Sequence, residues 1–75
     1  MKISITYCLQ WNYFPRAVSL ADEIKEAVAV EPELIGGQGG VFDVELDGVK
    51  IFSKHELHRF PAPNEIVELI RDQAG

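Results

Sequence analysis

The chain opens with an alternation of apolar and polar residues that predicts a β-strand. One face of this strand holds Ile3, Ile5 and Tyr7, and the other holds Ser4, Thr6 and Cys8. The spacing then becomes helical over residues 13–29, where an apolar stripe runs beside charged positions. Pro15 fits the first turn of this helix, because its missing N–H group would have no helical partner there. Asn12 is the expected N-cap, with Trp11 as the alternative entry residue.

A hairpin is the clearest local prediction in the second half of the chain. Pro32 and the glycines of 36–40 first interrupt the pattern, with a short strand candidate at 33–35 between them. Apolar and polar residues then alternate over 41–46 and over 49–52, on the two sides of Asp47-Gly48. An Asp-Gly pair favours the type I′ turn of a two-residue hairpin, because both central residues of that turn need positive φ.

The chain ends with a second predicted helix. A polar segment at 53–59 leads to Pro63, which suits a first helical turn, and the apolar stripe that follows contains Ile66, Leu69 and Ile70. The expected order is β-α-β-β-β-α, an α/β (α+β) fold with two layers in which two helices cover a mixed sheet. The strands that flank the first helix should run parallel through a right-handed crossover, and the hairpin should extend the sheet.

Composition and charge indicate one small folded domain spanning residues 1–75. Hydrophobic residues make up 47% of the chain and charged residues 25%, which is ordinary for a globular protein. The net charge of −5 opposes nonspecific binding to nucleic acid or to anionic membranes. No long apolar run or signal-like start is present, and a single cysteine cannot form an internal disulfide. A cytoplasmic location is therefore expected.

Cys8, the single cysteine, falls where the first strand should end and the first helix should begin. The N–H groups of a helix N-terminus favour thiolate over thiol and can lower a cysteine pKa into the range of about 3.5–7.5. The alternative is a buried cysteine that fills space as a small hydrophobe. Position alone leaves both interpretations open.

Short motifs in a fixed order along nearly the whole chain resemble one protein family. In chain order they are Tyr7-Cys8, Arg16-Ala17, Leu20-Ala21-x-Glu23-Ile24, Gly39-Gly40-Val41-Phe42-Asp43-Val44, Asp47-Gly48, Ile51-Phe52-Ser53-Lys54, Phe60-Pro61 and Ile70-Arg71-Asp72. Together they resemble the selenoprotein W/T/H (Rdx) family. The resemblance implies a thioredoxin-like fold and a thiol redox role at a Cys-x-x-Cys or Cys-x-x-selenocysteine motif. By position, the first member of that motif is Cys8 and the second is Trp11.

Trp11 in the second position limits the chemistry that the resemblance implies. Thiol–disulfide exchange forms a mixed disulfide, which a second thiol then resolves. Cys8 alone performs only the first step, so glutathione or a thiol of a partner protein must complete the cycle of a monothiol oxidoreductase. No cofactor is expected. Trp11 either is a lid or stacking surface that shapes a substrate cleft beside the thiol, or is a large aromatic that caps the core where a cysteine sits in relatives.

The candidate binding cleft beside the catalytic candidate Cys8 consists of Trp11, Gly39, Gly40, Val41 and Phe42. The glycines of 36–40 lack the Lys and Ser/Thr of a phosphate-binding loop, so nucleotide binding is disfavoured. Their favoured role is a tight backbone path that lets a peptide or glutathione approach main-chain groups.

Positive charge gathers late in the chain, at Lys50, Lys54, His55, His58 and Arg59. Such a patch attracts the carboxylates of glutathione or an acidic partner, although lysines that guard a sheet edge explain it equally well. The two histidines have the spacing His-x-x-His, but further ligands are lacking, so a solvated loop is favoured and no metal is expected.

Two functions from different classes follow from these residues. The first is a small thiol-redox protein in which Cys8 forms mixed disulfides. The second is a non-catalytic, thioredoxin-like binding module that holds a partner protein without turnover. Replacing Cys8 with Ser abolishes covalent trapping in the first case and leaves binding intact in the second. A homodimer through the sheet edges is a further alternative.

Overall fold

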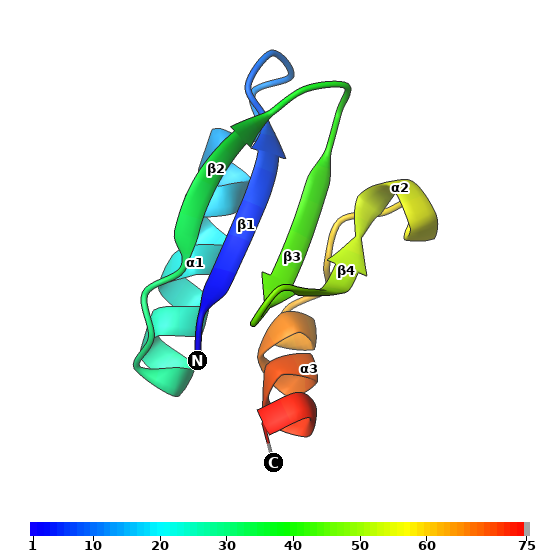
Figure 1. The fold of residues 1–75 in the computed structure, drawn as a ribbon. Coiled ribbons are helices and arrows are strands. Elements are labelled where there is room, and N and C mark those ends of the chain that lie inside the picture. The colour runs from blue at the N-terminus through cyan, green and yellow to red at the C-terminus, as the bar shows by residue number, and fades with distance from the viewer. Residues whose placement is uncertain (75) are drawn as a thin grey trace.

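The computed structural model describes residues 1–74, which form a four-stranded sheet with two long helices packed on it (Figure 1). The elements are β1 (Ile3–Cys8), α1 (Phe14–Val28), β2 (Glu33–Gly37), β3 (Phe42–Leu46), β4 (Val49–Ser53), α2 (Lys54–Leu57) and α3 (Glu65–Ala74). The strand order is β2-β1-β3-β4, with β1 parallel to β2 and antiparallel to β3, and with β3 antiparallel to β4. The predicted mixed sheet and two-layer α+β fold are confirmed.

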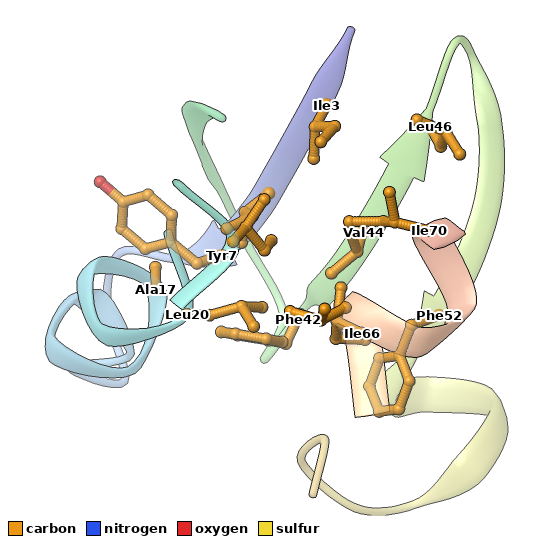
Figure 2. Close-up of a cluster of buried hydrophobic side chains, with 13 residues drawn as sticks. Ile3, Tyr7, Ala17, Leu20, Phe42, Val44, Leu46, Phe52, Ile66 and Ile70 are labelled. Atoms are coloured by element: carbon orange, nitrogen blue, oxygen red, sulfur yellow. The ribbon is translucent and has the colours of Figure 1, made fainter. Parts of the chain in front are cut away.

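The core lies between one face of the sheet and the apolar stripes of α1 and α3 (Figure 2). It contains Ile3, Ile5, Tyr7, Ala17, Leu20, Ile24, Phe42, Val44, Leu46, Phe52, Ile66, Val67 and Ile70. Since successive strand residues point to opposite faces, Ser4 and Thr6 lie on the other face, where they are only half-buried. Cys8 ends this second row of β1 and is fully buried.

The hairpin turn is the predicted one. Asp47 and Gly48 have φ values of 52° and 83°, as a type I′ turn requires. The turn is tied to the start of β1, because the Asp47 N–H donates to the Lys2 carbonyl at 2.7 Å and the Lys2 N–H donates to Asp47 Oδ1 at 2.8 Å. The hairpin turn is thus hydrogen-bonded to the start of the central strand β1, in addition to the pairing between β3 and β4.

Two helix predictions need correction. The N-cap of α1 is Tyr13, whose side chain makes no capping bond, and not Asn12. Asn12 has φ 58°, so it turns the chain in the left-handed conformation before the helix begins. Part of the segment expected to be a polar loop forms the short helix α2. Its C-cap is the left-handed His58, whose N–H donates to the Lys54 carbonyl at 2.6 Å. No helix among residues 1–74 is long and apolar enough to span a bilayer.

Strand β2 extends further than its apolar residues indicate. The prediction ended at 35, but Gly36 and Gly37 continue the strand, where they pair with Tyr7 and Cys8 of β1. A Cβ at either glycine would approach a neighbouring side chain closely, so the absence of one permits this pairing. The sheet therefore continues up to the cysteine.

Candidate functional site

Backbone pairing on both sides fixes the position of Cys8 at the end of β1. The Cys8 N–H donates to the carbonyl oxygen of Val41 at 2.9 Å, and the Leu9 N–H donates to the carbonyl oxygen of Gly37 at 3.1 Å. The chain at Cys8 is thus held between the end of β2 and the approach to β3. The thiol itself has no contact with solvent.

Three backbone N–H groups, those of Gly40, Trp11 and Gln10, donate to the Cys8 sulfur. Desolvation of the buried thiol raises its pKa, but these hydrogen bonds outweigh it and leave the pKa of Cys8 below its ordinary value. The expected source of this effect was wrong, because α1 begins only at Phe14. The loop that follows β1 and the glycines that precede β3 favour the thiolate in place of a helix N-terminus.

Trp11 covers Gly40 from outside. A Cβ placed on Gly40 would lie 2.6 Å from Cζ3 of Trp11, so the indole ring rests directly on the bare Cα. The Trp11 side chain is 58% exposed, and its ring meets the edge of Tyr13 at a centroid distance of 6.1 Å. Trp11 therefore does not fill the core. It forms an outer cover over one of the three groups that hold the sulfur.

The other predicted cleft residues, Gly39, Val41 and Phe42, lie in three different environments. Val41 supplies the carbonyl that binds the Cys8 backbone. Gly39 has φ 70° and faces open space, since a Cβ there would meet no atom within 4 Å. Phe42 is buried on the helix-covered face, where its ring lies 5.3 Å from that of Phe60. The structure thus brings Trp11, Gly40 and Val41 to Cys8 and places Phe42 in the core.

Large apolar side chains are exposed in the segment that follows Cys8. Leu9 is 64% exposed and rests on Gly36, where a Cβ would lie 2.8 Å from its Cδ1. Phe14 is 52% exposed and packs against Tyr7 at 5.7 Å between ring centroids. Trp11 is exposed as well, so three large apolar side chains of residues 9–14 are in contact with solvent. Each packs on a different neighbour: Leu9 on Gly36, Trp11 on Gly40 and Phe14 on Tyr7.

The sequence model of the Rdx family matches residues 2–72 of this chain. The chain belongs to the Rdx family. Membership associates it with thioredoxin-like, redox-related proteins. Among Rdx relatives, Migration and invasion enhancer 1 of Bos taurus is 32% identical and that of Mus musculus is 33% identical, each over 72 residues. These alignments cover 95% of this chain and 63% of each relative, so the chain spans less than two thirds of their length.

Solved structures agree with the Rdx fold. A selenoprotein W-related protein from Vibrio cholerae is 27% identical, with a TM-score of 0.86 over 99% of this chain and 96% of that one. A protein from Bordetella parapertussis is 28% identical, with a TM-score of 0.91 over 96% of this chain and 95% of that one. The predicted family is thus confirmed by sequence and by structure.

Two members of the predicted basic patch, Lys50 and Arg59, form ion pairs within this Rdx chain. Lys50 Nζ lies 3.7 Å from Asp43 Oδ2. Arg59 binds Glu65 through two hydrogen bonds of 2.7 Å, and this side-chain hydrogen bonding lowers the pKa of Glu65 to about 2. His55 and His58 are exposed, and residues 1–74 contain no cluster of three or more metal-ligating side chains.

Two cations flank an aromatic cluster next to Trp11. Arg16 Cζ lies 4.0 Å from the centroid of the Phe60 ring, and Lys54 Nζ lies 5.6 Å from the Tyr13 ring and 5.4 Å from the Phe60 ring. Tyr13 also contacts Trp11 edge to face, so the aromatic surface leads toward the thiol. Lys54 belongs to the predicted basic patch, whereas Arg16 was not predicted to lie at this site. The sequence motifs that contain Arg16 and Phe60 are identifiable, but a local pattern does not reveal a contact between residues 44 positions apart.

Proposed function

We propose that this Rdx protein is a monothiol redox protein in which Cys8 exchanges disulfides with a partner and is regenerated by an external thiol. The observation that carries the proposal is the convergence of three backbone N–H groups on the Cys8 sulfur. Such donors stabilise the negative charge of the thiolate, and the thiolate is the nucleophile in disulfide exchange.

The exchange takes place in two balanced steps. The Cys8 thiolate attacks one sulfur of a disulfide, a new S–S bond forms to Cys8, and the other sulfur leaves as a thiolate. A second thiolate, such as that of glutathione, then attacks the sulfur attached to Cys8. Cys8 leaves as a thiolate, and the former partner carries the new disulfide to glutathione. Residue 11 cannot perform the second step, because tryptophan has no thiol.

Reaction requires that the covered sulfur becomes accessible. Cys8 has no solvent contact, whereas Trp11, which covers its donor Gly40, is more than half exposed. Displacement of an exposed surface ring requires less rearrangement than opening of the core. We therefore assign the role of cover to Trp11 and the roles of donors to Gln10, Trp11 and Gly40 through their N–H groups.

The test is the rate of alkylation of Cys8 by iodoacetamide as a function of pH, in the folded protein and in urea. The folded protein should show an apparent pKa below that of the denatured chain, which is expected near ~8.5. Incubation with oxidised glutathione should then give a mixed disulfide, seen by intact mass, that reduced glutathione removes. Labelling that proceeds only at the rate of global unfolding would rule the proposal out.

A second candidate function is favoured by the full burial of the thiol and by the exposed side chains of Leu9, Trp11 and Phe14 in the segment that follows it. In that case the protein binds a partner through these side chains without covalent chemistry. The Cys8→Ser variant separates the two candidates. Recovery of the same partner by the variant and by the wild type under reducing conditions supports the binding module, whereas a partner seen only as a reducible adduct of the wild type supports exchange.

A further inference from the structure

A cavity of about 440 Å³ lies between α1 and the segment 60–63, on the helix-covered side of the sheet. Its apolar lining includes Leu20 and Phe42, both labelled in Figure 2, together with Phe60. Arg16 and Glu23 line it as well, from the same helix. Cys8 is not part of its wall, and the proposed exchange chemistry does not use it. Volumes of about 300–1,000 Å³ are typical of sites that bind a ligand.

We propose that this groove binds an extended segment of a partner protein in which an apolar side chain stands between an acidic and a basic one. The apolar side chain contacts Leu20 and Phe60, the acidic one meets Arg16, and the basic one meets Glu23. This docking role is independent of the thiol chemistry of Cys8.

The charges at the two ends of the groove are the first support. Arg16 and Glu23 are seven residues apart on α1, which places them about 10 Å apart along the helix axis. No Asp or Glu side chain among residues 1–74 forms an ion pair with Arg16. The contact of the Arg16 guanidinium with the Phe60 ring does not use a carboxylate, so its N–H groups remain available to one. A ligand with charge at only one end would leave the other end unmatched.

The geometry of the wall is the second support, because the segment opposite α1 is held in place before any ligand binds. Glu65 accepts hydrogen bonds from Arg59 at 2.7 Å and from the Ala62 N–H at 2.8 Å. Glu23 Oε1 accepts a bond of 3.2 Å from the Asn64 N–H, which connects α1 to this segment. Pro61 further restricts the backbone. A groove that is already formed loses little conformational entropy on binding.

An extended segment of five residues fits these constraints. Side chains at its first, third and fifth positions point to the same side, and its ends lie about 13 Å apart. The two charged side chains then lean inward toward Arg16 and Glu23, while the middle one enters the groove. The probe is the capped pentapeptide Asp-Gly-Leu-Gly-Lys. Matched peptides are Asp-Gly-Leu-Gly-Asp, Lys-Gly-Leu-Gly-Lys and Asp-Gly-Ser-Gly-Lys.

The experiment is a titration of the full ¹⁵N-labelled chain followed by amide resonances. Asp-Gly-Leu-Gly-Lys should shift resonances of α1 and of 60–65, and it should bind roughly two- to fivefold more tightly than each matched peptide. Glu23→Gln, which keeps an acceptor for the Asn64 N–H, should remove the preference over Asp-Gly-Leu-Gly-Asp. Glu26→Gln, on the exposed face of α1, makes the same charge change outside the groove and should retain it.

A second variant tests the other end of the groove. Arg16→Gln should remove the preference over Lys-Gly-Leu-Gly-Lys, whereas Lys25→Gln, whose charge lies outside the groove, should not. Equal affinity of the wild type for all four peptides would overturn the proposal, as would shifts confined to resonances outside α1 and 60–65. Neither result would affect the exchange chemistry, because that is measured at Cys8.

Discussion

Gly39 and Gly40 offer a matched pair of substitutions that separates backbone strain from the covering role of Trp11. Both glycines have left-handed φ values, 70° and 76°. An alanine at Gly39 meets no atom within 4 Å, whereas its Cβ at Gly40 lies 2.6 Å from Cζ3 of Trp11. The two variants therefore share the strain and differ in the contact with the ring.

The shared effect is a loss of stability. Alanine in the left-handed conformation costs about 1–2 kcal/mol, so Gly39→Ala and Gly40→Ala should each lower the free energy of unfolding by roughly that amount. At Gly40 the overlap forces the exposed Trp11 ring outward. Loss of a ring contact worth about 1 kcal/mol raises the fraction of molecules with the ring displaced roughly fivefold, since ~1.4 kcal/mol corresponds to a factor of ten.

The assay is the rate of Cys8 alkylation at constant pH, measured beside urea unfolding of the same samples. Gly40→Ala should react roughly fivefold faster than Gly39→Ala at similar stability. Because both variants carry the same backbone strain, a difference between them reports the displacement of Trp11 and not general loosening. Equal alkylation rates in the two variants would refute the view that Trp11 controls access to the sulfur.

Three further predictions follow from the geometry. The pKa of Glu65 is lowered to about 2, so this group stabilises the fold above its ordinary pKa of 4.5 and loses that effect as pH falls from there toward 2. Urea unfolding from neutral pH down to about pH 2 should show Glu65→Gln to be the less stable protein at neutral pH, with its difference in stability from the wild type closing in acid; a constant difference would contradict the assignment. Ile5→Val, at a fully buried position of β1, should lower the free energy of unfolding by about 0.5–1.5 kcal/mol in the same assay, and no change would mean that the core repacks without loss. Gly48→Ala should lower it by about 1 kcal/mol through backbone strain alone, since its Cβ meets no atom, and an unchanged midpoint would argue against a type I′ turn.

The order of the main strands and helices was predictable because its signals are local. Alternation marks β1, the Asp47-Gly48 pair marks the hairpin, and Pro63 precedes the last helix. The short helix α2 was missed because it presents no apolar stripe and buries none of its residues. The end of β2 was missed because Gly36 and Gly37 carry no side chains from which a strand pattern can be read. Both depend on tertiary contacts that a local pattern does not contain.

The candidate site was predictable only in part. Cys8 and Trp11 could be chosen from position and from the family motif, and Gly40 from the glycine cluster. The role of Gln10 could not, because its backbone N–H, and not its side chain, acts on the sulfur. Arg16 was missed for a different reason: its significance depends on a ring that a distant segment brings to it.

The dependence of the thiol on Gly40 links its reactivity to the completion of folding. The central strand β1 pairs with β2 and β3, which both follow α1 in the chain, so closing the sheet around it requires long loops. The hairpin of β3 and β4 is local by comparison and can form earlier. During synthesis, Cys8 emerges well before the glycine that later donates to its sulfur. A chain whose β1 has not docked therefore lacks the Gly40 donor, and the full set of three thiolate-stabilising donors assembles only with the finished sheet. A cysteine at a helix N-terminus, by contrast, would take all of its donors from its own neighbouring segment.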